Sequence, residues 1–344
     1  MKNLFVGIFI LLLLSITSSN TLAATAPPLA ANQVRDGQKI DLQQEKYQIL
    51  FRELEQEHGY TRQGLNSIFK GVTIKRKVLI LMDTQWEAKP YYLYRPRFVT
   101  RSIIRKSRNK LNKHKKVLDL IEQEIGVDRE VVIAIWGIES RFGKNSGSFN
   151  VFQSLNTLFD AYPRRSDFFR KQLIEFLALC KEHSYNPLTI KGSYAGAFGQ
   201  TQFIPSSFRS YAVSFDGNGQ CDVFDSIEDI LASIANYLSH FHWSLNAPLY
   251  ADIGSILKGE AVKKAHSLGR NGFVDYLTVQ KEQKLALPIP PQGRPLTIVR
   301  LKKDPEKGGG SRYIAGYPNF QAITEWNHSN RFAMAVCELA EAIR

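Results

Sequence analysis

The sequence predicts a mainly helical protein with a small β-containing insertion, which makes the fold α+β overall. Apolar residues recur at helical spacing through residues 103–125, 166–180 and 226–241 of the 344-residue chain. Residues 285–295 hold four prolines, and the apolar run 296–301 that follows them is typical of a strand. Helical spacing returns after this run, so we expect the strand-bearing stretch to interrupt a helical core.

The sequence predicts short helices and irregular segments in the first part of the chain. Residues 24–32, which include two prolines, are expected to form a flexible lead-in, and the segments 51–54 and 65–69 are expected to lie in short helices. Residues 91–97 mix tyrosine and arginine around Pro96 and are less regular. The helical stretch 103–125 that follows is amphipathic and strongly basic.

Residues 131–139 carry the most informative helical pattern. Asp128 can cap this helix, whose residues are apolar nearly all round, so we expect the helix to be buried. A carboxylate at the end of such a helix is out of place. Burial would raise the pKa of Glu139 and keep it protonated, ready to donate a proton to a leaving oxygen. The open alternative is a structural ion pair of Glu139 with Arg141 or another arginine.

A glycine-rich loop spans residues 191–207. Its three glycines stand among small residues and allow another backbone or a ligand to approach closely. Ser193 and Gln202 could form hydrogen bonds with a polar ligand. A tight crossing of packed helices would explain the glycines equally well, and the loop alone does not decide.

The chain begins with the pattern of a secretory signal peptide. Lys2 precedes an apolar run from Leu4 to Ile16, and a polar stretch leads to Ala23 and Ala24, after either of which cleavage is expected. The run is shorter than the roughly 20 residues of a membrane-spanning helix. We therefore expect an exported protein with no stable membrane span, and an uncleaved N-terminal anchor is the alternative.

The charge of +13 favours anionic partners, namely nucleic acid, a membrane surface or a carboxylate-bearing cell wall. Export and the lack of a nucleic-acid motif argue against nucleic acid. A purely solubilising role of the charge stays open. Cys180, Cys221 and Cys337 are too few for a disulfide framework, and we expect small buried residues. The sequence does not decide between one bridge and none.

Five motifs occur in one order along the chain. They are Gly-Ile-Glu-Ser-Arg-Phe-Gly at 137–143, Tyr-Pro-Arg-Arg at 162–165, the loop 192–205, Ala-Asn-Tyr at 235–237, and Pro-Asn-Phe at 318–320 with Ile-Thr-Glu-Trp-Asn-His-Ser at 323–329. Together they resemble the membrane-bound lytic murein transglycosylase B family. The resemblance covers the chain from about Tyr94 onward and is weakest between residues 246 and 310.

The resemblance implies a goose-lysozyme-like helical core with a small β-domain, and cleavage of the MurNAc-GlcNAc β-1,4 bond of peptidoglycan that leaves a 1,6-anhydro-MurNAc end. It implies that Glu139 is the single catalytic acid/base. A hydrolase of the usual kind needs two carboxylates beside the bond. One suffices if it first protonates the leaving oxygen and then takes the proton from O6 of the same sugar.

The resemblance also implies the substrate-binding residues. These are Ser193, Gln202, Tyr94, Arg164, Arg165, Tyr237, Asn319, Trp326 and Asn327. The family usually has tyrosine where Trp326 stands, a change that keeps an aromatic face for a sugar. Because Arg164 and Arg165 precede Ser166, which is expected to cap a helix, they start from a constrained turn. Alternatively, they pair with Asp160 or Asp167 and only fix the start of that helix.

Residues 214–222 resemble the EF-hand-like calcium loop of the family. The expected ligands are Asp216, Asn218 and Gln220, with Glu228 one turn later. The first ligand position holds Ser214 and the closing position holds Asp225 rather than a bidentate glutamate. No cofactor is required for the expected reaction. A structural calcium ion and a metal-free, hydrogen-bonded turn are both open.

We expect the following organisation: a signal peptide at 1–23, an N-terminal helical region at 24–120, a lysozyme-like catalytic core with the EF-hand-like loop at 121–245, a small β-containing domain at 246–314, and a return to the helical domain at 315–344. The expected location is the periplasm, and the expected partners are peptidoglycan glycan strands and other cell-wall enzymes. A hydrolytic muramidase and a non-catalytic peptidoglycan-binding scaffold are the alternative functions.

Overall fold

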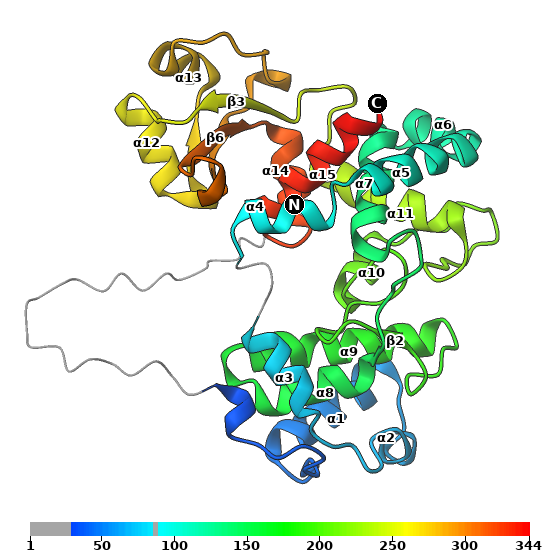
Figure 1. The fold of residues 1–344 in the computed structure, drawn as a ribbon. Coiled ribbons are helices and arrows are strands. Elements are labelled where there is room, and N and C mark those ends of the chain that lie inside the picture. Colours follow the sequence, from blue (N-terminus) through cyan, green and yellow to red (C-terminus); the bar gives the residue numbers. More distant parts are fainter. Residues whose placement is uncertain (1–28, 85–88) are drawn as a thin grey trace, which may run out of the picture.

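The computed structural model describes residues 29–84 and 89–344, so the predicted signal peptide and the first part of the lead-in lie outside the described residues. Figure 1 shows a lower helical lobe, a central group of helices and an upper lobe that contains a sheet. Across both described ranges, no helix has the length and apolar character needed to cross a bilayer. The predicted mainly helical fold with a β-containing insertion is confirmed.

The lower lobe joins the beginning of the chain to two later helices. It contains α1 (Glu45–His58), α2 (Arg62–Ile68), α3 (Arg76–Asp83), α8 (Val151–Ala161) and α9 (Ser166–Glu182). Helix α3 packs on α8, and α1 packs on α9. Aromatic side chains fill the space between them: the Tyr47 ring lies edge-on to Phe159 with centroids 4.9 Å apart, and Phe69 meets Phe152 at the same distance. The segments 51–54 and 65–69 fall in α1 and at the end of α2, as expected.

Helix α7 (Arg129–Ser140) lies at the centre of the protein. It contacts α5 (Arg101–Lys113), α6 (Lys115–Glu124), α11 (Ile227–His240) and α15 (Asn330–Ile343). Every residue of α7 from Val131 to Ile138 is buried, which confirms the expectation for this helix. The residue types explain this burial, because a helix that is apolar on all sides can be stable only when other elements cover every side.

The upper lobe is built on an antiparallel sheet of order β3-β6-β5-β4. Its strands are β3 (Tyr250–Gly254), β4 (Phe273–Val274), β5 (Leu296–Lys302) and β6 (Ser311–Gly316), and α12 (Glu260–Ser267) and α13 (Tyr276–Gln283) pack with them. The predicted strand at 296–301 is confirmed as β5. Successive side chains of a strand point to opposite faces. Ile298 therefore lies in the small core of this lobe, whereas Val299 lies in the large helical core.

The remaining elements are short and connect these parts. They are the helices α4 (Tyr91–Tyr94), α10 (Pro205–Tyr211) and α14 (Pro318–Glu325), the 3-10 turns η1 (Ala30–Asn32), η3 (Arg95–Arg97), η4 (Pro163–Arg165), η5 (Gly269–Asn271), η6 (Pro291–Gly293) and η7 (Pro305–Lys307), and the paired two-residue strands β1 (Phe149–Asn150) and β2 (Lys191–Gly192). The three cysteines are buried and unpaired, as expected of small buried residues.

Two of the expected helix caps are wrong. Asp128 stands at the N-cap position of α7, but its side chain makes no capping hydrogen bond. Its carboxylate instead accepts from the indole of Trp243 at 2.8 Å and from the Arg344 guanidinium at 3.0 Å. Ser166 is the first residue of α9, and its hydroxyl donates to the Phe159 carbonyl at 2.7 Å. Both side chains thus bond to residues outside their own helices, which a local sequence pattern cannot predict.

Candidate active site

Glu139 is the penultimate residue of α7 and is half-buried, whereas the helix from Val131 to Ile138 before it is buried. The helix stops there because Arg141 and Phe142 have positive φ angles of 51° and 61°. The Phe142 ring then folds back over Gly137, where an added Cβ would lie only 2.7 Å from the ring. Glycine is required at 137, because any side chain there would push this ring away. The turn thus fixes the end of the helix that carries Glu139.

Gln200 connects this helix to the glycine-rich loop. Its side-chain oxygen accepts from the Trp136 indole at 2.9 Å, and its amide donates to the Phe224 carbonyl at 2.6 Å. A Cβ at Gly143 would lie 2.4 Å from the same amide oxygen. Gln200 was not among the predicted site residues, because nothing in the loop pattern separates it from the neighbouring Gln202.

The glycines of the loop serve backbone packing. A Cβ at Gly147 would lie 2.1 Å from the carbonyl carbon of Gly192, and a Cβ at Gly192 would lie 2.1 Å from the Ala197 oxygen. These are contacts between a turn and a loop and within the loop, so these two glycines do not serve the crossing of packed helices considered above. They hold the turn after α7 directly against the loop that carries Ser193 and Gln202.

Ser193 and Gln202 each keep one hydrogen-bonding function that no residue of the described chain uses. The Ser193 oxygen accepts from the backbone N–H groups of Ala195 and Ala197 at 3.3 and 3.0 Å, which leaves its O–H as a donor. The Gln202 amide donates to the carbonyls of Ser146 and Gly199 at 3.0 and 2.9 Å, which leaves its side-chain oxygen as an acceptor.

Aromatic rings gather beside this loop. Tyr237 of α11 and Trp326, which follows α14, lie with ring centroids 4.6 Å apart, and Phe203 of the loop lies 5.1 Å from Trp326. The structure thus brings together two of the predicted sugar-binding residues from distant parts of the chain. Tyr94 packs on Phe98 at 4.8 Å, and both predicted tyrosines are 5% exposed.

The arginine motif borders a cavity of about 510 Å³. Arg165, Tyr194 and Asn327 line it together with Arg300, Arg331 and His328. The guanidinium of Arg165 stacks on the Phe168 ring at 4.1 Å, and Arg164 is exposed. Asp160, one of the partners considered for these arginines, pairs with Lys46 at 2.6 Å. Arg300 and Arg331 were missed because they come from β5 and α15, far from the motif in sequence.

Asn319 lies away from any open surface. It is 1% exposed, and both ends of its amide bond to the backbone of Ser244, at 2.9 and 2.8 Å. Its amide therefore helps to hold the turn after α11, and its burial keeps it from an open surface. The predicted substrate contact of Asn319 does not agree with this placement.

The EF-hand-like loop is closed by the protein's own hydrogen bonds. The two Asp216 oxygens accept from Asn218 and Ser226, and the Asn218 side-chain oxygen accepts from the Gln220 N–H at 2.7 Å. Asp229, which is fully buried on α11, accepts from three further backbone N–H groups of the loop, those of Phe215, Asp216 and Asp222. Asp229 was not among the residues predicted for this loop.

These residues do not fit a calcium ion. Calcium takes six to eight oxygen ligands, with charge supplied by several carboxylates. Here the Ser214 hydroxyl forms hydrogen bonds inside the loop, with the side chains of Asp216 and Asn218 and with the Gly219 N–H. Throughout residues 29–84 and 89–344, no group of three or more His, Cys, Asp or Glu side chains is placed to hold a metal.

The fold and this site define a lysozyme-like enzyme whose acidic residue ends a buried helix. The Transglycosylase SLT domain family matches residues 43–341, so the chain belongs to this family. Membrane-bound lytic murein transglycosylase B of Escherichia coli (strain K12) is 33% identical over 302 residues, covering 83% of this chain and 79% of that protein. The resemblance seen in the motifs is confirmed, and the chain is a lytic transglycosylase.

Solved structures agree with this assignment. The soluble lytic transglycosylase SltB1 from Pseudomonas aeruginosa is 34% identical, with a TM-score of 0.73 over 86% of this chain and 97% of that chain. The Escherichia coli lytic transglycosylase Slt35, solved in complex with calcium, is 30% identical, with a TM-score of 0.75 over 89% of this chain and 95% of that chain.

Proposed function

We propose that this enzyme cleaves the β-1,4 bond between MurNAc and GlcNAc in peptidoglycan and closes a 1,6-anhydro ring on MurNAc, with Glu139 as the single acid/base. The observation that carries the proposal is the position of Glu139, which is half-buried and directly follows the buried stretch from Val131 to Ile138. Murein is the substrate named for the Escherichia coli relative. Both facts favour acid catalysis on a glycan in a cleft.

The reaction needs two proton transfers and no water. In the first, the Glu139 carboxyl gives its proton to the glycosidic oxygen while the C1–O bond breaks and positive charge develops at C1. In the second, the Glu139 carboxylate takes the proton from O6 of the same sugar while O6 bonds to C1. The glutamate ends protonated as it began. Closing a ring within one bound sugar is efficient because both reacting atoms are already held together.

Other side chains support substrate positioning. The unused O–H of Ser193 and side-chain oxygen of Gln202 offer one donor and one acceptor to a sugar. The half-buried Trp326 offers an aromatic face of the kind that sugars stack on, and the buried Tyr237 packs against it. Arg164 and Arg165 would hold carboxylates of the peptide stems, because a planar guanidinium binds a carboxylate through two hydrogen bonds.

The substrate also suggests the location. Peptidoglycan lies outside the cytoplasmic membrane, and the predicted signal peptide would deliver the chain to it. We propose export to the periplasm. N-terminal sequencing of the mature protein purified from its native cells tests this, because cleavage is expected after Ala23 or Ala24 and an intact N-terminus would indicate an anchor.

Mass spectrometry of the products tests the reaction. Sacculi incubated with the purified protein should release muropeptides that are lighter by one water than the products of a hydrolase, because the anhydro ring replaces the reducing end. Products with ordinary reducing ends would identify a hydrolytic muramidase. Sacculi left intact, with the protein bound to them, would identify a scaffold.

A further inference from the structure

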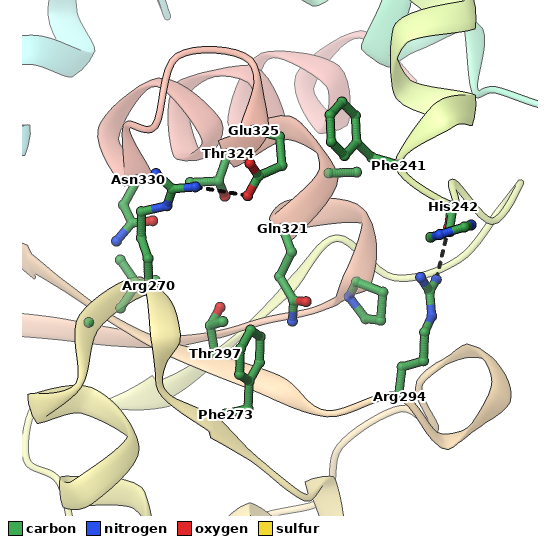
Figure 2. A pocket seen from close by; sticks show the side chains of 14 residues that line it. Phe241, His242, Arg270, Phe273, Arg294, Thr297, Gln321, Thr324, Glu325 and Asn330 are labelled. Carbon is green, nitrogen blue, oxygen red and sulfur yellow. Dashed lines mark hydrogen bonds and ion pairs between the residues drawn. The ribbon is translucent and has the colours of Figure 1, made fainter. Parts of the chain in front are cut away.

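A second cavity lies where the helical core meets the sheet. It has a volume of about 270 Å³ and is enclosed by the end of α11, by α14, and by residues of η5, β4 and β5. Figure 2 shows Gln321 reaching from α14 into this space, with Phe273 and Thr297 of the sheet on one side and Arg294 on the other. None of the residues proposed above for sugar binding lines it.

The charges of this cavity do not cancel. Arg270 pairs with Glu325 at 2.9 Å across one side. On the other side, Arg294 donates through Nη2 to the His242 carbonyl at 3.0 Å and to the Ser244 hydroxyl at 3.3 Å. Its Nε is buried and has no hydrogen-bond partner among the described residues. Because a buried N–H of a charged group is costly to leave unsatisfied, this atom favours a ligand that brings an acceptor.

The other walls are suited to a peptide. The Gln321 amide donates to the Pro295 carbonyl at 2.9 Å, which leaves its oxygen free to accept from a ligand N–H. Phe273 is a large apolar side chain that is 52% exposed, and it stands beside that amide. An acceptor, a cationic donor and an apolar wall match the N–H, carboxylate and methyl groups of a short acidic peptide better than the hydroxyls of a sugar.

This cavity adjoins the cavity of Arg165. Asn330 lines both of them, and Glu325 of the one is followed two residues later by Asn327 of the other. A peptide whose first carboxylate lies on Arg165 could therefore continue into the space between the lobes.

We propose that the cavity between the lobes binds the acidic peptide stem of the substrate, with a stem carboxylate accepting from Arg294 Nε and an apolar stem side chain on Phe273. The proposal rests on the proposed function, because it takes peptidoglycan as the substrate. It adds a site that would favour glycan strands whose stems are intact.

Binding measurements test it. In a Glu139→Gln background, which prevents turnover, titration calorimetry compares a GlcNAc-MurNAc disaccharide that carries its peptide stem with the same disaccharide without it. Phe273→Ala and Arg294→Met should each weaken binding of the stem-bearing ligand about tenfold, the order expected for one hydrogen bond to a charged group or one apolar contact, and leave the stemless ligand unchanged.

Matched controls lie in the same lobe but outside the cavity. Leu277→Ala removes a side chain that is 57% exposed on α13, and Lys302→Met removes an exposed cation of β5. Neither should alter either affinity. Arg294 also bonds to His242 and Ser244, so its replacement can lower the melting temperature. If Arg294→Met does so, the test rests on the exposed Phe273.

Two outcomes separate this inference from the proposed function. Suppose that the wild-type protein makes anhydro products and Phe273→Ala binds the stem-bearing ligand with unchanged affinity. This outcome overturns the inference only. Wild-type protein that makes no such products, combined with selective loss of stem binding in Phe273→Ala, overturns the function and supports the cavity. Equal weakening for both ligands also overturns the inference, because the stem would then not be the bound group.

Discussion

The indole N–H of Trp136 donates to the side-chain oxygen of Gln200 at 2.9 Å, which joins the helix that carries Glu139 to the glycine-rich loop. Trp136 is fully buried, so no water can replace this acceptor. Gln200→Leu should therefore lower the free energy of unfolding by about 1–3 kcal/mol, the cost of one unsatisfied buried donor. Urea denaturation measures it.

Gln200→Glu is a second variant, because it keeps an acceptor for Trp136 and replaces the donor to the Phe224 carbonyl with an oxygen. Its loss of stability therefore reports on the bond to Phe224. A Gln200→Leu protein that unfolds at the same urea concentration as wild type would contradict the role of this contact.

Glu139→Gln should abolish cleavage of sacculi while the protein still folds. The amide is nearly the same size but cannot deliver a proton, and general acid catalysis alone contributes about 100- to 10,000-fold. The loss should exceed this range because the same group also acts as the base. Glu130→Gln, on the first turn of the same helix, is the control and should retain activity. Activity of Glu139→Gln within about tenfold of wild type, far short of that loss, would falsify the assignment.

Replacing Arg164 and Arg165 together with alanine should impair turnover of intact sacculi far more than turnover of glycan strands stripped of peptide. Both side chains are exposed, so little stability should be lost, and added salt should reproduce part of the defect in wild type. Lys171→Ala, an exposed cation on α9, is the control. Equal losses on both substrates, or a large fall in melting temperature, would assign these arginines to the scaffold.

Calcium should raise the melting temperature little, because the loop at 214–222 is already closed by internal hydrogen bonds. By contrast, Asp229→Ala should lower the free energy of unfolding by at least about 3 kcal/mol, since three backbone N–H groups lose a charged acceptor. Asp225→Ala, an exposed carboxylate nearby, should be nearly neutral. A shift of several degrees with millimolar calcium that Asp216→Ala abolishes would show that the loop binds the metal.

His114 should make the protein less stable at mildly acidic pH. Burial, followed by the charges of Lys110 and Lys113, lowers the pKa of this imidazole below its usual 6.5, and its Nε2 has no hydrogen-bond partner. The unfolded chain then binds the proton more readily, so stability is lost as the pH falls through about 6.5 towards the lower folded pKa. His114→Gln should reduce the difference in melting temperature between pH 7.5 and 5.5, and an unchanged difference would contradict this.

Elements with strong periodicity could be predicted from the sequence. The buried helix ending at Glu139 and the strand at 296–301 were both found where residue types alone determine burial. Contacts between distant segments could not be predicted. The sequence predicts that Asp128 caps its helix, yet its carboxylate binds Trp243 and Arg344. These two residues are distant in the sequence and come close to Asp128 only in the folded protein.

Prediction of the site from the sequence has the same limit. The motifs pointed to Glu139, Ser193 and Gln202, whereas Gln200 and Asp229 act through bonds to residues whose position only the fold defines. Asn319 lies within a recognised motif, but its amide is used entirely by Ser244. A motif identifies which residues belong to a site region, and the hydrogen-bond partners decide which of them can meet a ligand.

Strand β5 is buried on both faces, with Ile298 in the small core and Val299 in the large one. The sheet lobe therefore cannot separate from the helices without exposing the same strand that holds it together. In hydrogen exchange, the amides of β5 and of α7 should open with similar free energies, as parts of one cooperative unit. Excision of residues 246–316, which hold all four strands of this sheet, should accordingly yield neither a folded sheet lobe nor a folded remainder.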